Sequence, residues 1–222
     1  MSPGDGHGGD AAGSTLAIVY ATFAEAEPLL TALAARPLTG RPYAAFVATP
    51  GTGSVPVVVA ITGMGLAAAT TGVDAVIAYE RPQGLLNAGI AGALHEAHAI
   101  GAVLRIGAVA ECNDDALAAH AFHPIDAAAM AWLPPTAPRV RLVSRTAPLF
   151  DARLRDRLAR SADLVDMEGA RVAARCAQAG VPCALLKAVS DHATDRATLL
   201  ANLAEGARRL ADHLAPPLRR AC

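Results

Sequence analysis

Aromatic side chains are scarce in this chain: one Trp, three Tyr and four Phe make up 4% of its 222 residues. Proteins that bind single-stranded nucleic acid stack the bases on such side chains. The formal net charge is −1 with both signs interspersed, so the sequence has no basic run for a phosphate backbone. Nucleic acid is therefore not an expected partner.

Long apolar runs are also missing. The longest, such as residues 55–61, have the length of a strand and fall short of the roughly 18–20 apolar residues that span a bilayer. Residues 1–14 are polar and rich in glycine, without the basic and apolar regions of a signal peptide. We expect a disordered tail at 1–14, no membrane partner and a cytoplasmic location.

Cysteine and histidine do not occur at metal-binding spacing. The four cysteines are Cys112, Cys176, Cys183 and Cys222. They form no C-x-x-C pattern and read as reduced thiols of a cytosolic protein. The pairs His95/His98 and His120/His123 have no further ligand cluster beside them, so neither a metal nor another cofactor is expected.

Apolar residues make up 53% of the chain, and 54 of its residues are alanine. Alanine buries little area, so the core must be built by close approach of helices and strands. Short apolar runs typical of buried strands alternate with helical patterns. The expected strands are 15–22, 43–49, 55–62, 84–88, 100–110, 139–144 and 183–190. The expected helices are 23–35, 66–79, 150–161, 165–179 and 195–214.

This alternation predicts an α/β fold built as one domain over residues 15–222. A turn is expected at 50–54, and 112–138 reads as a loop-rich excursion with a short helical piece at 127–132. Ligands of such folds gather at the carboxyl ends of the strands. The polar and glycine-rich residues at those ends are therefore the candidate site residues.

Two of these strand ends precede helices. Glu25 and Glu27 open the first helix, where carboxylates also simply favour the helix dipole. Gly63-Met64-Gly65 follows the strand at 55–62 and would let a ligand approach the backbone. Ala68 stands where G-x-G-x-x-G needs its third glycine, so a dinucleotide site is disfavoured and a plain tight turn stays equally open.

The other strand ends lie later in the chain. The small-residue run 87–93 would expose backbone N–H groups to an anion or a sugar hydroxyl, or else serve close packing. Asp166-Met167-Glu168-Gly169 places two carboxylates and a methionine at a helix start. Lys187-Ala188-Val189-Ser190-Asp191 places a hydroxyl and a carboxylate where a very apolar strand ends, although Asp191 could also be a cap or turn residue.

Taken in this order, these segments resemble the nucleoside phosphorylase/nucleosidase superfamily over residues 15–214. The sequence is most similar to the methylthioadenosine/S-adenosylhomocysteine nucleosidases, with the futalosine hydrolases as near relatives. The resemblance implies a three-layer α/β/α sandwich around a twisted mixed β-sheet, a homodimer, and cleavage of a purine N-glycosidic bond. It also implies a small-molecule purine nucleoside as substrate and a role in nucleoside catabolism and methionine salvage.

The resemblance implies a role for each candidate. Glu25 would activate the attacking water, with Glu27 open as an alternative, and Asp191 would share a proton with N7 of the purine. Glu168 would bind the ribose hydroxyls and favour a cationic sugar. The remaining substrate-binding candidates are Met64, Ala91, Gly92, Asp166, Met167 and Ser190, of which Ser190 would steady Asp191.

Water is favoured over phosphate as the nucleophile. The phosphorylases of this superfamily carry arginines near the first strand turn, but no arginine falls between Ala21 and Ala35 here, and Asn87 precedes the glycine-rich run. Ile90 stands where the methylthioadenosine enzymes have a serine, which is more similar to the futalosine hydrolases. Futalosine hydrolysis, phosphorolysis and a non-catalytic nucleoside-binding module therefore stay open as alternatives.

Overall fold

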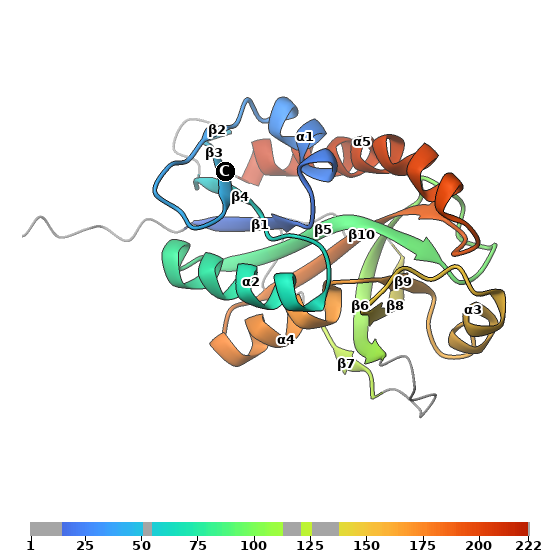
Figure 1. Ribbon diagram of the computed structural model, residues 1–222. Coiled ribbons are helices and arrows are strands. Elements are labelled where there is room, and N and C mark those ends of the chain that lie inside the picture. Colours follow the sequence, from blue (N-terminus) through green and yellow to red (C-terminus); the bar gives the residue numbers. More distant parts are fainter. Residues whose placement is uncertain (1–14, 51–54, 113–120, 126–137, 222) are drawn as a thin grey trace, which may run out of the picture.

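A mixed β-sheet runs through the whole molecule (Figure 1). The computed structural model describes residues 15–50, 55–112, 121–125 and 138–221. The expected tail at 1–14, most of the turn at 50–54 and the helical piece at 127–132 lie outside these residues. Within them, no helix is long and apolar enough to cross a membrane.

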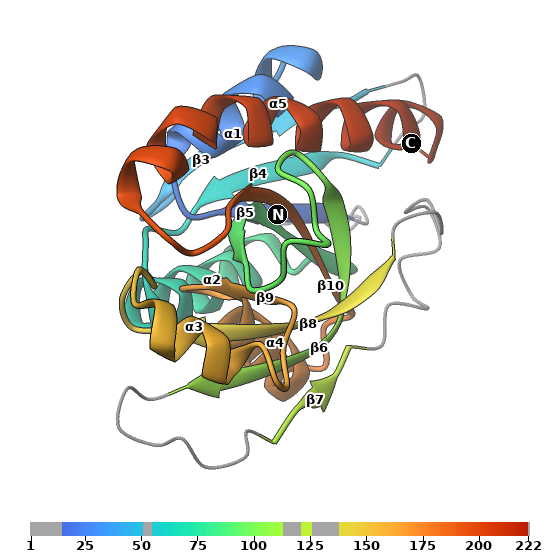
Figure 2. The same cartoon turned by 90° about the vertical axis from the view of Figure 1, so that its right-hand side faces the viewer.

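The strands of the sheet are β1 (Leu16–Tyr20), β2 (Arg36–Pro37), β3 (Ala44–Ala48), β4 (Val57–Ile61), β5 (Gly84–Ala93), β6 (Val103–Cys112), β7 (His123–Pro124), β8 (Arg139–Arg145), β9 (Leu164–Asp166) and β10 (Cys183–Asp191). Their order is β10-β6-β8-β9-β5-β1-β4-β3-β2, with β7 beside β6. Because β10 also pairs with β5, the strands β5, β10, β6, β8 and β9 close into a ring, which lies below α1 and α5 in Figure 2.

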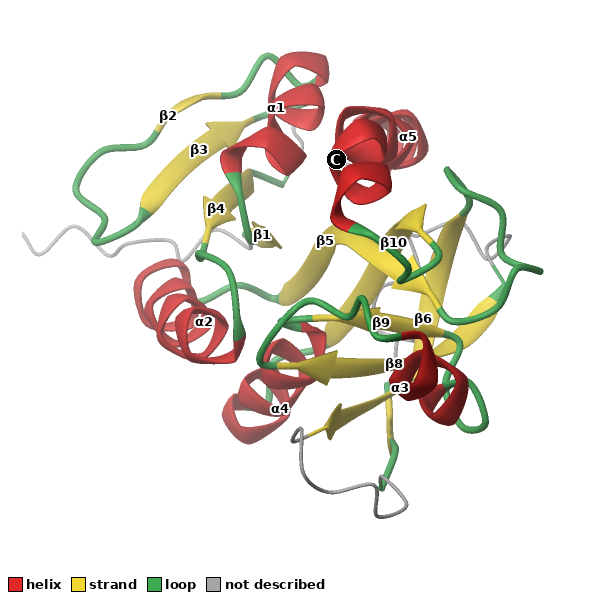
Figure 3. Ribbon diagram, turned by 45° about the vertical axis from the view of Figure 1, so that its right-hand side comes forward, coloured by secondary structure: helices red, strands yellow, loops and turns green. Residues whose placement is uncertain are grey.

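The helices are α1 (Phe23–Ala32), α2 (Leu66–Glu80), α3 (Ala152–Leu158), α4 (Gly169–Ala179) and α5 (Arg196–Ala221). In Figures 1 and 3, α1 and α5 cover one face of the sheet, while α2 and α4 cover the other. The shorter α3 packs near β8 and β9, where Leu158 joins Val143 and Val165 in a small apolar cluster. The expected three-layer α/β/α sandwich with a mixed sheet is confirmed.

The two faces of the sheet are buried by alternate residues of the same strands. On β5, Leu86 and Ala88 belong to the core under α1 and α5, whereas Leu85 and Ala91 belong to the core on the α2 and α4 side. This is the two-residue period of a strand that is covered on both faces. The sheet therefore separates two apolar cores, one under the helices of each face.

Small residues let the helices approach closely. A Cβ atom placed on Gly206 of α5 would lie 3.1 Å from Cγ2 of Ile90 and 3.6 Å from Cβ of Ala188. A larger side chain there would push α5 away from β5 and β10. The abundance of alanine and glycine thus serves close packing of helix on sheet.

Several expected boundaries differ from the structure, including the closing helix, which runs to Ala221 instead of residue 214, and two of the differences lie near the candidate site. Residues 89–93 are not a loop after the strand, because they continue β5 by pairing with β10 and β9. The helix expected at 165–179 begins only at Gly169, because residues 164–166 form β9 between β5 and β8. In both cases pairing with strands distant in sequence overrides the local pattern.

Candidate functional site

Glu25 lies buried at the start of α1, with 5% of its surface exposed. Its Oε2 accepts hydrogen bonds from the backbone N–H of Thr22 at 3.0 Å and from the Thr22 hydroxyl at 2.7 Å, and the pair forms a capping box. Its Oε1 accepts the backbone N–H of Ile90 on β5 at 3.1 Å. Glu27 is exposed, so only Glu25 points into the protein at the sheet edge.

Gly89 makes room for this carboxylate. A Cβ atom at this position would lie 3.0 Å from Oε1 of Glu25 and 3.5 Å from Nζ of Lys187. A side chain on residue 89 would therefore displace both charged groups. The absence of a side chain at Gly89 of β5 thus allows Glu25 from α1 and Lys187 from β10 to lie close to the same position of this strand.

Lys187 is a buried cation in an otherwise apolar strand. Its Nζ lies 2.8 Å from Oδ2 of Asp166, and both side chains are almost inaccessible to solvent. Burial lowers the pKa of Lys187, but the charges of Asp166, Glu168 and Glu25 raise it by more, so the net shift is upward. The lysine therefore stays protonated among three carboxylates.

Both oxygens of Asp166 are already engaged. Oδ1 accepts the hydroxyl of Ser144 at 2.5 Å, and Oδ2 accepts the N–H of Gly169 at 3.0 Å in addition to the Lys187 contact. These bonds fix the end of β9, the start of α4 and the middle of β10 relative to one another. Asp166 is thus placed to hold Lys187 and the start of α4 in position.

Glu168 bridges α4 and the turn after β4. The N–H of Gly65 donates to its Oε1 at 2.7 Å. Burial raises the pKa of Glu168 to about 7, helped by repulsion from Asp166 and Glu25, while Lys187 and the Gly65 N–H act in the opposite direction. Next to this carboxylate, Met167 is partly buried and Met64 is 68% exposed, so apolar surface borders the acid.

Asp191 ends β10 and is 1% exposed. Its Oδ2 accepts the Ser190 hydroxyl at 2.7 Å, and its Oδ1 accepts the N–H of Ala193 at 2.6 Å. The register with β5 shifts between Val189 and Asp191, a bulge that places Asp191 opposite Gly92. A Cβ atom on Gly92 would lie 3.2 Å from Oδ1, so this glycine also gives a carboxylate room.

Two of the three candidate carboxylates therefore lie along one stretch of β5. Glu25 lies at Gly89 and Ile90, and Asp191 lies at Gly92. Two to three residues of strand separate these contacts, which is about 7–10 Å. Glu168 interacts electrostatically with Glu25 and Lys187 and so belongs to the same group. Two buried carboxylates, Glu25 and Asp191, are thus held near each other but too far apart to share a proton.

Sequence reasoning missed Ser144, which lies in β8 and looks like an ordinary strand residue. Its hydroxyl donates to Asp166 and accepts the N–H of Ala170 at 2.8 Å. Sequence reasoning also gave Lys187 no role, although a lysine inside the apolar strand 183–191 could have indicated a buried charged group. In the described part of the chain, no group of three or more His, Cys, Asp or Glu side chains is placed to hold a metal ion.

The fold agrees with comparisons to known proteins. The phosphorylase superfamily model matches residues 15–162 and 114–216, and the chain belongs to this superfamily. No curated protein matches the sequence.

Solved structures share the fold at low sequence identity. The 5′-methylthioadenosine/S-adenosylhomocysteine nucleosidase of Helicobacter pylori superposes with a TM-score of 0.83 at 19% identity, covering 94% of this chain and 99% of that one. Futalosine hydrolase of the same organism gives 0.83 at 19% identity, covering 95% and 99%. The nucleosidase of S. pneumoniae gives 0.80 at 20% identity, covering 92% and 98%.

Proposed function

We propose that this protein is a nucleosidase that hydrolyses the N-glycosidic bond of a 5′-substituted purine nucleoside such as methylthioadenosine or S-adenosylhomocysteine. The observation that carries the proposal is a group of three buried carboxylates: Glu25 and Asp191 lie along the glycine-rich end of β5, and Glu168 interacts electrostatically with Glu25. Glycosidic hydrolysis needs an acid for the leaving group and a base for water, held apart. A module that only binds nucleosides would not need three such carboxylates.

Glu25 is the proposed base. Hydrogen bonds from Thr22 and Ile90 hold its carboxylate in one orientation, so that it accepts a proton from water without first reorganising. Burial against β5 would shield a water molecule bound at Glu25 from bulk solvent. Glu27 is exposed and has no comparable contact with the sheet.

Glu168 is proposed to bind the ribose hydroxyls. Its ionised form would also stabilise the positive charge that develops on the sugar as the bond breaks. Met167 and Met64 would supply apolar surface to the sugar or the base, and Ala91 and Gly92 would supply backbone. Asp166 is proposed to act indirectly in substrate binding. Its contacts with Lys187 and with the Gly169 N–H at the start of α4 would hold these groups in place around Glu168.

Asp191 is the proposed acid, and Ser190 is proposed to stabilise both its ionised and its protonated form. The Ser190 hydroxyl has two acceptors, Oδ2 of Asp191 at 2.7 Å and the carbonyl of Ala91 at 3.3 Å. When Asp191 carries a proton, the hydroxyl can turn to Ala91 and accept that proton in a hydrogen bond. Ser190 therefore accommodates both protonation states as a proton passes between Asp191 and N7 of the purine.

Water is the proposed nucleophile. A phosphate would need cationic partners, and Lys187, the cation beside Glu25, is bound to Asp166. The second candidate substrate is futalosine, because the aliphatic Ile90 replaces a serine and offers no hydroxyl near the sugar. The two kinds of solved structure match equally well, so the substrate must be found by assay.

We also propose a cytoplasmic homodimer acting in nucleoside catabolism and methionine salvage. The three cysteines of the described residues, Cys112, Cys176 and Cys183, are buried and form no disulfide, as in proteins of reducing compartments. The dimer follows the resemblance to the nucleosidases and is checked by the mass of the protein in solution.

The proposal is tested by incubating the protein with methylthioadenosine, S-adenosylhomocysteine, futalosine and inosine, each with and without phosphate. Release of adenine from the first two without phosphate is the expected result. Release from futalosine alone would select the second candidate, and strict dependence on phosphate would make the protein a phosphorylase. No release from any substrate would contradict the enzymatic function.

A further inference from the structure

His192 follows Asp191 in the chain, and its imidazole is bonded to a loop that is distant in sequence. Nε2 of His192 lies 3.2 Å from the carbonyl oxygen of His98, 94 positions earlier. A carbonyl oxygen can only accept a hydrogen bond, so Nε2 carries a proton and the imidazole is the donor. The residue next to the proposed acid is therefore bound to the loop at 94–102, between β5 and β6.

The backbone beside His192 has an unfavourable conformation. Ala193 has a φ of +52°, in the left-handed region that residues other than glycine, asparagine and aspartate rarely adopt. Its side chain is buried in the small apolar cluster near α3, and its N–H donates to Oδ1 of Asp191 at 2.6 Å. Such a conformation persists only where several contacts hold it. The direction of the Asp191 carboxyl group thus depends on the backbone at 192–193.

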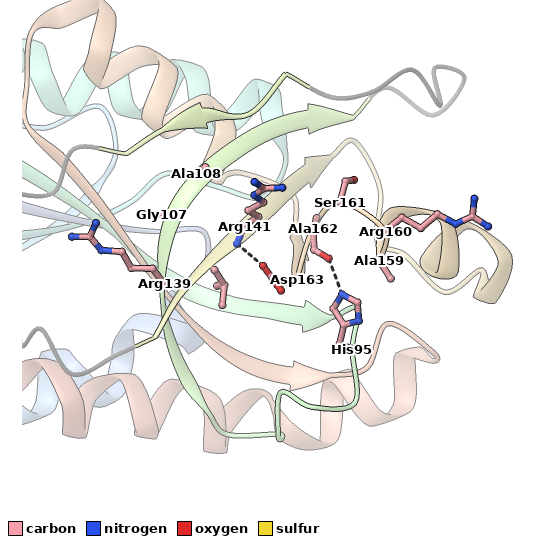
Figure 4. A pocket seen from close by; sticks show the side chains of 11 residues that line it. His95, Gly107, Ala108, Arg139, Arg141, Ala159, Arg160, Ser161, Ala162 and Asp163 are labelled. Carbon is pink, nitrogen blue, oxygen red and sulfur yellow. Dashed lines mark hydrogen bonds between the residues drawn. The ribbon is translucent and has the colours of Figure 1, made fainter.

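The loop at 94–102 is itself fixed to the segment that precedes β9. The imidazole of His95 points to Ala162, whose carbonyl oxygen lies 3.2 Å from Nε2 (Figure 4). Nε2 of His98 lies 3.5 Å from Oδ1 of Asp163. Oδ2 of this aspartate accepts the backbone N–H of Arg141 at 2.7 Å, as the same view shows. The loop therefore offers the imidazole of residue 192 a partner that is held in place.

The end of this loop is bonded to β10. The N–H of Gly101 donates to the carbonyl oxygen of Val189 at 2.8 Å, and the N–H of Val189 donates to the carbonyl oxygen of Ala102 at 2.9 Å. Val189 lies two positions before Asp191, and the register of β10 on β5 shifts between them. Asp191 therefore lies in a short segment, 189–193, that the loop holds at one end through backbone bonds and near the other through an imidazole.

We propose that His192 is a positioning residue that holds the Asp191 carboxyl group in place through its hydrogen bond to His98. Its role rests on the proposed function, in which Asp191 shares a proton with the leaving base. Ser190 and Ala193 bind the two carboxyl oxygens, and His192 fixes the backbone between them. Without the bond to His98, Ala193 would relax to a negative φ and its N–H would leave Oδ1. A displacement of about 1 Å near a reacting group slows catalysis by about a hundredfold.

Three substitutions of His192 test this role. His192→Leu removes the donor, so kcat for base release should fall about tenfold or more, while KM changes by less than about twofold. His192→Gln places an amide N–H at about the reach of Nε2 and should restore most of the loss, whereas His192→Asn is too short and should behave like His192→Leu. His123→Leu is the matched control: His123 is exposed on β7, and this variant should match the wild type.

Amide hydrogen exchange measured by NMR adds a readout that needs no activity. The N–H of Ala193 should exchange about tenfold or more faster in His192→Leu and His192→Asn than in the wild type, and His192→Gln should restore its protection. The N–H of Val189, which is bonded to Ala102, is the internal reference and should exchange at an unchanged rate. An equal rise in both rates would show that His192 only stabilises the fold, and would overturn the proposal.

The proposal would also be overturned by a kcat of His192→Leu like that of the wild type, by a loss that His192→Gln does not restore, or by an equal loss in His123→Leu. If His192→Leu fails to fold, His192→Asn and His192→Gln make the same comparison. Base release by the wild type with an unchanged Ala193 exchange rate would leave the proposed function standing and remove the positioning role. If the wild type releases no base, the proposed function fails, and the exchange rates alone decide whether His192 holds the turn.

Discussion

The backbone N–H of Gly65 donates a 2.7 Å hydrogen bond to Oε1 of Glu168, joining the turn after β4 to the start of α4. These residues are 103 positions apart, and the bond places the carboxylate near the carboxyl ends of β4 and β1. The bond favours the ionised carboxylate, whereas burial and Asp166 favour the protonated one. The balance puts the pKa of Glu168 at about 7, where small changes in pH alter its charge.

We predict that kcat/KM rises with pH through about 7. The proposed role of Glu168 requires its ionised form, and the raised pKa means that this form is lost as the pH falls below 7. A pH profile of base release should show this limb in the wild-type enzyme. The variant Glu168→Gln should lose about a hundredfold or more in activity and show no such limb. A variant profile that keeps the same limb would assign it to another group.

The same shift predicts an effect on stability. The pKa of Glu168 is higher in the folded chain than its ordinary 4.5, so between pH 4.5 and 7 the folded state retains a proton that the unfolded state has lost. The free energy of unfolding therefore falls as the pH rises through this window, by at most about 3 kcal/mol. In Glu168→Gln the free energy of unfolding should not fall in this way. Urea unfolding should therefore show the variant to be more stable than the wild type at pH 8 but not at pH 5.

We predict that Asp191→Asn loses turnover by about a hundredfold or more while it still binds a purine nucleoside. Asparagine keeps the size of the side chain but has a single oxygen. It can therefore replace only one of the two acceptor oxygens that bind the Ser190 hydroxyl and the Ala193 N–H, and it cannot supply a proton. Ser190→Ala should have a smaller effect, of about tenfold. Titration with a non-hydrolysable analogue separates binding from turnover, and full activity of Asp191→Asn would remove it as the acid.

Glu25→Gln and Glu27→Gln form a matched pair of variants, two positions apart on one helix. We predict a loss of activity of about a hundredfold or more for Glu25→Gln, because its carboxylate is buried against Ile90. Glu27→Gln should act like the wild type, since its side chain is exposed. Steady-state assays at saturating substrate compare kcat directly. A loss of activity in Glu27→Gln alone would identify Glu27 as the base instead of Glu25.

The approach of these carboxylates was predictable from sequence because β1, β5 and β10 are parallel and their carboxyl ends share an edge. The sequence could not decide between Glu25 and Glu27, since helix starts are uncertain by a residue or two. The capping box with Thr22 fixes which residue of the first turn faces the sheet, and this is why Glu25 is the proposed base.

Other parts of the site depend on contacts that sequence patterns do not encode. β9 has three residues, too few for a periodic signal, and it exists because Val165 pairs with both Gly92 and Val143. The bond between Ser144 and Asp166 spans 22 positions and joins β8 to β9. Neither contact follows from local propensity, so the expected helix began too early.

The buried pair of Lys187 and Asp166 gives a final prediction, on stability. Lys187→Met should destabilise the fold by about 3–5 kcal/mol, because it leaves the Asp166 carboxylate buried beside Glu168 without a cation. The double variant Lys187→Met/Asp166→Asn removes both charges and should recover at least half of that loss, while the amide still accepts the Ser144 hydroxyl. Urea unfolding of the wild type and the three variants, including Asp166→Asn alone, gives the coupling energy of the pair. Simple additivity of the two single changes would mean that the pair does not act as a unit, and that Lys187 is stabilised by Glu25 and Glu168 instead.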